Sequence, residues 1–460
     1  MSQAHETTEP TGGVTVDPRP SGSSSGPAGS GGAGVGPETS GRGRAVLALG
    51  FSQAVDNSES GLINTFFPLI RSAFGLDYGA LGLLTAIPRL ARMLFGPFWA
   101  MMADRFGRKK VLFLVTGVWG LWTVLAGFAP SYELLVVLFA ISAIGTVASE
   151  PILNGLLPDI FARSERGKAY GLVRGIGGGV GIVMGPAIGL FGNHPEGWRY
   201  AMWAMGAVSI LSGILILLWV PNAKSGAASA VRTDPESGAF SFTEALKLFR
   251  IPTIALTVAM IPLVTSVAVL PFYSTFLVDV RGYSVPESTV IMAVHSVGVM
   301  ISSFLGGYLG DLFDRRLGAK GRVLLMQIYL VSFALTVFLT TQLPFDGRGF
   351  VYTASFALGL VFSIGFSGCV LPMISTVVPV QLSATAFAFL FSFVQGGIAA
   401  LFAMFAGRIA DSIGLTGTFL WFMTVPYLLN AVLWFGYYKV YPRDRAKQDA
   451  RTAAVLDGAI

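Results

Sequence analysis

The sequence contains little charge and almost no cysteine. Only 12% of its 460 residues are charged, whereas a soluble globular protein carries about 25%. Cys369 is the single cysteine, which excludes disulfides within the chain, cysteine-based zinc sites and dithiol redox chemistry. Because no nucleotide-binding loop, cluster of metal ligands or nucleophile triad is recognisable either, we expect the protein not to be an enzyme and to hold no cofactor.

Apolar residues are abundant instead, at 53% of the chain, with a mean hydropathy of +0.67. A run of about 20 apolar residues can cross a bilayer as a helix. The runs predict an all-α membrane protein with twelve transmembrane helices, in contact with the lipid bilayer. The predicted spans are 45–71, 79–103, 111–129, 133–160, 168–192, 200–220, 252–280, 287–313, 321–341, 349–378, 383–410 and 416–438.

The twelve spans form two groups of six. We predict six-helix bundles at 44–221 and 251–440, a cytoplasmic linker at 222–250, and cytoplasmic tails at 1–43 and 441–460. The first tail is rich in Gly, Ser and Pro and cannot bury enough apolar surface to become ordered. Within the linker, the stretch 240–249 is typical of an amphipathic helix on the membrane surface. The two halves also repeat each other in sequence, which predicts two structural pseudo-repeats.

Basic residues are distributed unevenly between the two predicted sides of the membrane. Every lysine and most arginines fall in the tails or in loops on the side of the termini. The arginines on the opposite side are Arg71, Arg199, Arg281, Arg348 and Arg408. Since cytoplasmic loops carry an excess of Lys and Arg, we expect a multi-pass protein of the cell membrane with both termini cytoplasmic. The net charge of +6 gives no reason to expect a nucleic-acid partner.

Charged and titratable residues inside the predicted spans are the candidates for function, because charge at membrane depth is costly. The candidates are Asp56, Glu59, Arg89, Arg92, Glu150, Arg174 and His295. The helical rise places Asp56 and Glu59 at the height of the two arginines of the second span. Each of these two pairs is spaced by three residues, which puts its members on one helix face.

Several interpretations of this set remain open. The arginines and carboxylates can neutralise one another in a structural network. Any of the three acids can instead take up and release a proton, or bind a substrate cation, as access to water alternates. The three arginines can hold the carboxylate or phosphate of an organic anion. His295 is either a proton carrier or a hydrogen-bonded packing residue.

A short basic turn joins the second and third spans: Ala103-Asp104-Arg105-Phe106-Gly107-Arg108-Lys109-Lys110. Asp311 ends the eighth span much as Asp104 ends the second. We expect Asp104, Arg105, Arg108 and Asp311 to form a cytoplasmic gate. When this side is shut, a carboxylate can cap a neighbouring helix N-terminus and pair with cationic loop residues.

Two motifs resemble those of the major facilitator superfamily. The basic turn is similar to the signature loop between helices two and three, with Ala100 and Met102 in place of the family's glycine and leucine. In the fifth span, Gly181, Gly185, Pro186 and Gly189 resemble the motif of the drug:proton antiporters, with Leu190 in place of a last glycine. Small residues at this spacing let helices approach closely, and proline bends a helix.

The resemblance implies two halves that rock about a central substrate site, acting as a monomer on a small-molecule substrate and protons. Ile141 stands where the exporters usually carry an arginine, so coupling must use another set of residues. The stretch 378–387 is similar to the spinster branch, whose members move sphingolipids and lysolipids. We expect proton-coupled efflux of a small hydrophobic or amphiphilic compound. The alternatives are uptake of an organic anion by proton symport, lysolipid or sphingolipid-type transport, and a non-transporting receptor or scaffold.

Overall fold

The computed structural model describes residues 37–162, 165–222, 248–344, 347–379 and 386–456. All regular structure within these ranges is helical, as the sequence predicts. The first helix begins at Pro37, inside the stretch predicted to be a disordered tail. Most of the predicted amphipathic helix at 240–249, and most of the spinster-like stretch at 378–387, lie outside the described residues.

In the described residues, the first half has a helix or a run of short helices at each of its six predicted spans, here called crossings, and the third and fourth are interrupted. Its elements are α1 (Pro37–Phe74), α2 (Tyr78–Phe106), α3 (Arg108–Leu112), η1 (Phe113–Val118), α4 (Gly120–Ala126), α5 (Tyr132–Thr146), α6 (Ser149–Ile160), α7 (Arg166–Gly189), η2 (Leu190–Asn193) and α8 (Gly197–Trp219). The label η marks short 3-10 or π-helical segments. The third crossing consists of α3, η1 and α4, and the fourth of α5 and α6.

The second half contains more interruptions than the first. Its elements are η3 (Leu248–Arg250), α10 (Pro252–Thr265), η4 (Ser266–Phe272), α11 (Tyr273–Asp279), α12 (Val285–Leu317), α13 (Ala319–Gln342), α14 (Arg348–Phe362), η5 (Phe366–Val370), α15 (Leu371–Val377), η7 (Ala388–Gln395), α17 (Gly396–Phe419), η8 (Leu420–Thr424), α18 (Val425–Leu433), η9 (Trp434–Gly436) and α19 (Tyr437–Leu456). The segments η5 and η7 are π-helical.

Nine stretches of the described residues are long and apolar enough to cross a membrane. The helices α1 and α2 are not among them, although they have 38 and 29 residues, and both carry charged residues in their middle turns. The last of the nine, Phe389–Arg451, passes through Gly414, where a φ of 74° breaks the helix. Each predicted span overlaps at least one helix of the described residues.

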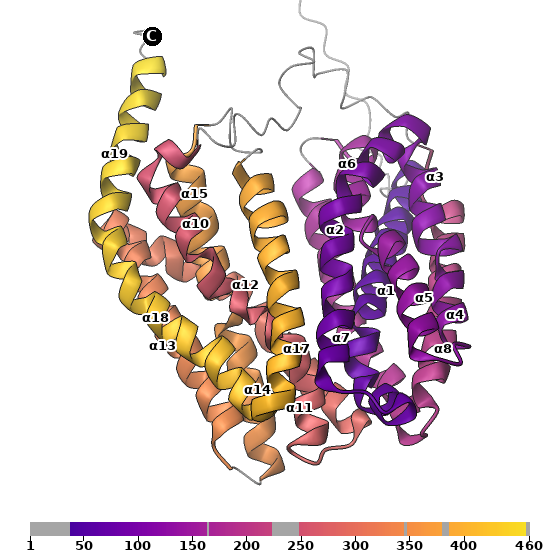
Figure 1. The fold of residues 1–460 in the computed structure, drawn as a ribbon. Helices are drawn as coiled ribbons and strands as arrows, with labels where there is room; N and C mark the ends of the chain where they lie inside the picture. Colours follow the sequence, from indigo (N-terminus) through magenta and orange to yellow (C-terminus); the bar gives the residue numbers. More distant parts are fainter. Residues whose placement is uncertain (1–36, 163–164, 223–247, 345–346, 380–385, 457–460) are drawn as a thin grey trace, which may run out of the picture.

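The two halves stand side by side, and both described termini lie at one end of the molecule (Figure 1). We call this end, which also carries the α2–α3 and α12–α13 turns, the terminal end. The opposite end, with the connections at 75–77 and 280–284, is the far end. Across the halves, α2 packs against α17 and α7 packs against α12.

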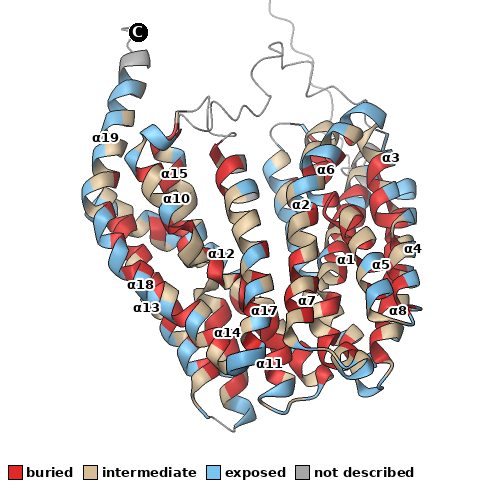
Figure 2. Cartoon of the chain, viewed as in Figure 1, coloured by how far each residue is buried: buried red, intermediate tan, exposed pale blue. Residues whose placement is uncertain are grey.

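Buried apolar side chains join the two halves toward the far end. One core cluster contains residues of both halves, among them Phe66, Leu81, Phe276 and Phe419. A second cluster, which includes Val46, Trp99, Leu112 and Ile152, contains residues of the first half alone and lies toward the terminal end. The buried residues run through the middle of each bundle (Figure 2). The apolar core therefore joins the two halves at the far end, and the halves separate toward the terminal end.

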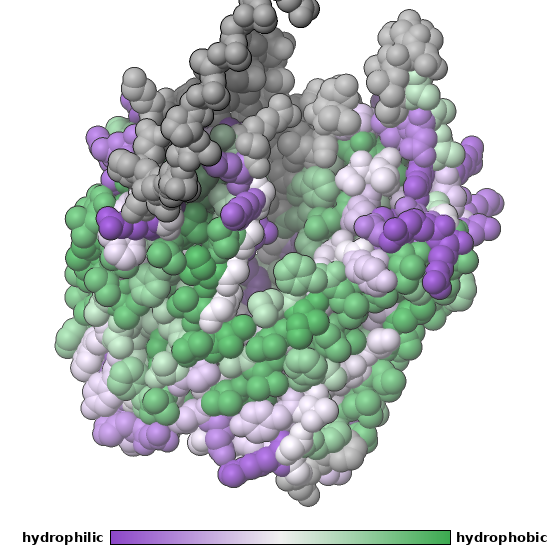
Figure 3. Space-filling view, turned by 180° about the vertical axis from the view of Figure 1, so that it is seen from behind, coloured by the Kyte–Doolittle hydropathy of each residue, from purple (hydrophilic) through white to green (hydrophobic). Residues whose placement is uncertain are grey.

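The outer surface is apolar around its middle. Large hydrophobic side chains such as Val183, Leu218 and Phe304 are 70% or more exposed. Figure 3 shows a belt of hydrophobic residues, with hydrophilic residues gathered toward both ends. Such a belt is stable only against lipid, because exposed apolar patches of this extent are rare on soluble proteins.

Candidate functional site

A cavity of about 960 Å³ lies between the two halves. The surface is hollowed between the halves toward the terminal end, with hydrophilic residues in its depth (Figure 3). Its first-half wall includes Ser60, Asn64, Thr65, Arg89, Arg92, Met93 and Glu150; its second-half wall includes Thr265, Ala268, Ser274, Met292, Phe362, Phe366, Phe391 and Gln395.

The two walls of the cavity differ in chemistry. Every charged side chain of its lining comes from the first half, and the three phenylalanines come from the second. Phe366 opens η5 and Phe391 lies in η7, with their ring centroids 5.2 Å apart. Since π-helical segments occur frequently at functional sites, the aromatic wall is a candidate surface for binding an apolar group.

Arg89 provides a positive charge in the first-half wall that no carboxylate of the described residues neutralises. Its guanidinium donates to the carbonyl of Thr85 at 2.8 Å and to that of Ala268, in the second half, at 3.0 Å. Carbonyl groups satisfy its hydrogen bonds without cancelling its charge. An anion entering the cavity would therefore find a fixed cation within reach.

The other charges of this region are paired or lie beside the cavity. Arg92 and Glu150 form an ion pair at 3.2 Å, with side chains 59% and 50% exposed. Arg174 is exposed and lines a separate small pocket with Glu150 and Tyr170. The Arg92–Glu150 pair leaves the cavity with a net positive charge from Arg89.

The two acids of α1 are buried but differ in their surroundings. Glu59 accepts hydrogen bonds from Thr123, from Ser142 at 3.1 Å and from Ser209 at 3.2 Å. Asp56 receives one long hydrogen bond, 3.4 Å from Ser52, and its Oδ1 has no partner in the described structure. Asp56 also lines a pocket of about 140 Å³ that contains the Arg92–Glu150 pair.

Asp56 and Glu59, which the helical rise places at the height of Arg89 and Arg92, are not their partners in the described residues. Neither acid forms an ion pair with an arginine in the described part of the chain, and Arg92 pairs with Glu150 instead. The helical rise gives the height of a residue but not the direction in which its face points. Glu59 faces the interior of the first half, at α4, α5 and α8. Asp56 lines the small pocket that Arg92 and Glu150 also line, and both arginines face the cavity.

His295 lies outside the cavity lining. It is buried on α12, where its Nδ1 is 3.3 Å from the carbonyl oxygen of Ser355 and its ring centroid is 5.9 Å from that of Phe362. These contacts join α12 to α14. Its surroundings match the packing interpretation of the sequence.

At the terminal end, the predicted gate residues of the first half bind partners within that half. Arg108 forms ion pairs of 2.7 Å with both Asp104 and Asp159, and it donates to the carbonyl of Gly155. Arg105 is exposed, with its guanidinium carbon 5.5 Å from the ring centroid of Phe106. Asp159 was not among the predicted gate residues, although its position just before the end of α6 was a signal.

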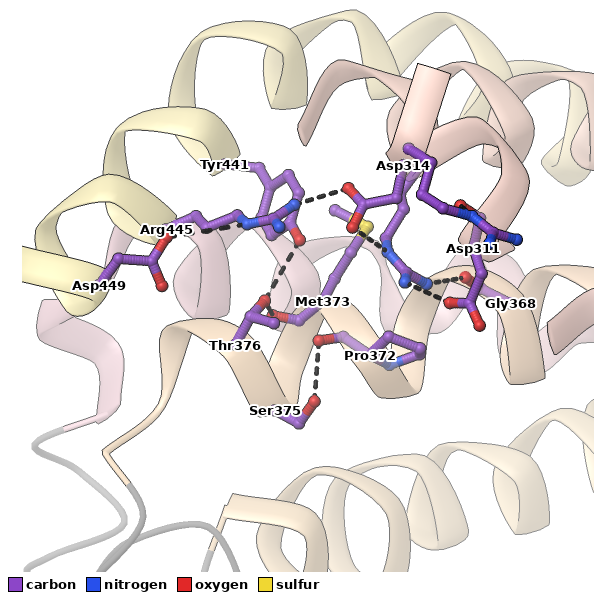
Figure 4. Close-up of polar contacts among 12 residues, drawn as sticks. Asp311, Asp314, Gly368, Pro372, Met373, Ser375, Thr376, Tyr441, Arg445 and Asp449 are labelled. Atoms are coloured by element: carbon purple, nitrogen blue, oxygen red, sulfur yellow. Dashed lines mark hydrogen bonds and ion pairs between the residues drawn. The ribbon is translucent and has the colours of Figure 1, made fainter. Parts of the chain in front are cut away.

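The second half has a corresponding cluster at the terminal end. Arg322 pairs with Asp311 at 2.9 Å and with Asp314 at 3.6 Å. Asp314 also pairs with Arg445 of α19 at 2.6 Å, as Figure 4 shows. Of these four residues the sequence indicates only Asp311. Asp314 and Arg322 lie in the last turn of α12 and the first turn of α13, and Arg445 lies in the predicted tail, all among other charged residues.

At the far end, polar contacts cross from one half to the other. Arg71 of α1 pairs with Asp279 of α11 at 2.7 Å, and the Tyr78 hydroxyl donates to the same carboxylate at 3.0 Å. The amides of Tyr78 and Gly79 donate to Asp411 of α17 at 2.7 and 3.0 Å. These contacts were not predicted from the sequence. The available signal was that Asp279 and Asp411 stand at the ends of predicted spans, on the predicted outer side.

The glycines of the predicted motif in α7 have two kinds of surroundings, close contact with α12 and an open groove. A Cβ at Gly189 would overlap the side chain of Thr289 in α12, so this glycine permits contact between the halves. A Cβ at Gly181 or Gly185 would meet nothing within 4 Å, because both line a groove of about 310 Å³. Pro186 lies inside the continuous helix.

Comparison with known proteins gives several relatives. The family description "Major Facilitator Superfamily" matches residues 49–400. The "Probable sulfoacetate transporter SauU" of Cupriavidus necator is 29% identical over 279 residues, 57% of this chain and 64% of that protein, so the match spans less than two thirds of it. The "Probable 4-methylmuconolactone transporter" of Cupriavidus pinatubonensis is 23% identical over 383 residues, 81% and 85% of the two chains. The "Quinolone resistance protein NorA" of Staphylococcus aureus is 24% identical over 310 residues, 66% and 70%.

Solved structures share the fold. A bacterial homologue of the human lysosomal transporter Spinster, in an inward-facing and occupied conformation, gives a TM-score of 0.70 at 20% identity, covering 88% of this chain and 98% of that one. The nucleoside transporter NupG gives a TM-score of 0.67 at 14% identity, covering 86% and 98%. The family match over most of the sequence establishes that the chain belongs to the major facilitator superfamily, a family of membrane-spanning transporters.

Proposed function

We propose that the chain transports a small organic anion by alternating access, with Arg89 binding the anionic group. The observation that carries this proposal is the position of Arg89 in the cavity wall, where it donates to two carbonyl groups and pairs with no carboxylate of the described residues. A guanidinium offers a planar array of donors that matches a carboxylate or sulfonate. Transporters of this type bind substrate between their halves near the middle of the membrane.

The opposite wall supports a substrate with an apolar portion. Phe362, Phe366 and Phe391 face the cavity from the second half, so an anion held at Arg89 would extend its body toward them. The names of two relatives, a sulfoacetate and a 4-methylmuconolactone transporter, agree with a small organic acid as substrate.

Asp56 is the residue to which we assign coupling to protons. It is buried, one carboxylate oxygen has no partner in the described structure, and its pocket leads to the Arg92–Glu150 pair. A carboxylic acid at such depth can be neutral or charged as its access to water alternates. Glu59, satisfied by three hydroxyl groups, and His295 have structural roles in this proposal. The direction is uptake by symport.

The distribution of basic residues supports an orientation with the terminal end in the cytoplasm. The five arginines predicted on the outer side all lie in helix ends or turns of the far end, and the described lysines lie toward the terminal end. We assign the protein to the cell membrane as a monomer. Asp104, Arg105, Arg108 and Asp311 then form a cytoplasmic gate that pairs across the halves when the terminal end closes.

A binding experiment on purified protein tests the proposal. Sulfoacetate and a series of small carboxylates are titrated by calorimetry against the wild type, Arg89→Lys, Arg89→Gln and, as a matched control, Arg174→Gln. Since hydrogen bonds to a charged group contribute about 1.5–3 kcal/mol, we expect Arg89→Gln to weaken anion binding by roughly tenfold or more. Arg174→Gln should bind as the wild type does. Binding of organic cations alone, or equal anion binding by Arg89→Gln, would contradict the proposal.

Proton-coupled efflux of an amphiphilic compound is the second candidate. The phenylalanine wall and the similarity to NorA favour it. In that case hydrophobic cations would stabilise the purified protein against heat, and substitution at Phe366 or Phe391 would remove the effect while substitution at Arg89 would not.

A further inference from the structure

The far end is closed by two carboxylates of the second half, Asp279 and Asp411. Asp279 lies at the end of α11, with its side chain 17% exposed, and pairs with Arg71. Asp411 lies on α17 beyond the cavity and accepts hydrogen bonds from two backbone amides of α2. All of these partners belong to the first half, so the contacts exist only while the halves touch here.

Asp411 caps a helix of the other half. The first four amides of an α-helix have no carbonyl partner within the helix. In α2, the helix's own N-cap, Asp77, accepts from Ala80 at 3.0 Å, and Asp411 accepts from Tyr78 and Gly79. A carboxylate at this position also interacts favourably with the positive end of the helix dipole.

Direct backbone contact brings the two helices into position for this cap. A Cβ on Gly82 of α2 would lie 2.5 Å from the carbonyl oxygen of Ala403, and one on Gly407 of α17 would lie 2.5 Å from that of Tyr78. Gly407 and Asp411 are one turn apart and share a face of α17. The two glycines therefore allow α17 to approach α2 closely enough for Asp411 to reach its first amides.

We propose that Asp411 and Asp279 form a latch that holds the far end shut and biases the transporter toward the state open at the terminal end. When the halves rock the other way, the first two amides of α2 lose the caps that the second half supplies, and Arg71 loses its carboxylate partner. The latch goes beyond the proposed function, because it acts on the equilibrium between the two states whatever the substrate.

Distances between spin labels test the latch in the full chain. Cys369→Ala gives a cysteine-free background, in which labels at Ser72 and Ser412 report on the far end and labels at Lys110 and Lys320 on the terminal end. Removal of a helix cap is expected to shift the ratio of the two states roughly fivefold. Asp411→Ala and Asp279→Ala should both lengthen the far-end distance and shorten the terminal-end distance.

Asp77→Ala is the matched control, since it removes a cap of the same helix that comes from within the first half. It should weaken α2 without shifting the distances. Asp411→Asn keeps the size of the side chain and serves if Asp411→Ala does not fold; it should produce a smaller shift in the same direction. Unchanged distances in both Asp411 variants, or an equal shift in Asp77→Ala, would overturn the proposal.

Discussion

The terminal end and the far end use the same residue types in opposite ways. At the terminal end, each half pairs its acids with its own arginines, as in Asp104–Arg108–Asp159 and Asp311–Arg322. At the far end, the acids of the second half bind groups of the first. The comparison shows that an acid at a helix end contributes to closure only when its partners lie across the halves.

The apolar core repeats this difference. Toward the far end one cluster of buried side chains continues through both halves. Toward the terminal end the first half keeps a cluster of its own. Buried apolar side chains therefore hold the two halves together at the far end in this state, and the polar contacts of Asp279 and Asp411 add to that closure.

The largest expected effect comes from removing the arginine of the first-half terminal cluster. Arg108→Met leaves Asp159, whose side chain is 2% exposed, as a buried charge without its partner. Breaking such a pair costs about 3–5 kcal/mol of stability, which chemical unfolding in detergent would measure. Arg105→Met, the control in the same turn, removes an exposed charge and should change stability by less than about 0.5 kcal/mol. Equal losses in the two variants would show that the ion pairs within the half do not stabilise it.

A smaller effect is expected from separating the backbones at the far end. In Gly82→Val, the new side chain overlaps α17, and overpacking of this kind costs about 1–3 kcal/mol. Hydrogen–deuterium exchange of the peptide containing Tyr78 and Gly79 should become faster, because Asp411 no longer holds their amides. Gly96→Val, at a position in α2 where a Cβ meets nothing within 4 Å, should leave the exchange unchanged. Equal exchange in both variants would show that the close contact between α2 and α17 does not position Asp411.

Between the two ends, substitutions at the two acids of α1 should have different effects, one on stability and the other on proton coupling. Glu59→Gln disturbs three hydroxyl donors and should lower stability by about 1–2 kcal/mol while retaining proton-dependent uptake in proteoliposomes. Asp56→Asn should retain stability and lose the dependence of uptake on the proton gradient. Loss of coupling in Glu59→Gln alone would reverse the assignment of the two acids.

The smallest effect is expected from a surface ion pair at the terminal end. Arg42 and Glu165 are 3.3 Å apart and 43% and 51% exposed, and exposed pairs contribute about 0–1 kcal/mol. Arg42→Ala should change thermal stability by little more than the error of the measurement. A loss as large as that of Arg108→Met would show that exposure does not decide which terminal-end pairs matter.

The fold could be predicted from the sequence because apolar runs of membrane length, repeated in two groups, leave few alternatives. The candidate site could be predicted only in part. Arg89, Arg92 and Glu150 could be found because charge inside an apolar span is conspicuous, but the pairing of Arg92 with Glu150 and the carbonyl partners of Arg89 could not. Pairing depends on which way each helix face points, and the helical rise along α1 and α2 carries no information on that.

The sequence also does not show at which end of the molecule a carboxylate caps a helix of the other half. The capping by a carboxylate that the sequence predicts for the terminal end occurs in this state at the far end, through Asp411. Nothing in the spacing of residues indicates which end is closed in a given state. The partners of Asp411 are backbone amides, which every helix start possesses and which no residue type marks.

Access to the cavity tests the contrast between the two ends most directly. Ser60, in the cavity lining, is replaced by cysteine in the Cys369→Ala background, and a membrane-impermeant thiol reagent is added to either side of sealed vesicles. The structure predicts faster reaction from the side that carries the C-terminus, with Ser72→Cys reacting from the other side. Faster reaction of Ser60→Cys from the side of Ser72 would contradict a closed far end and an open terminal end.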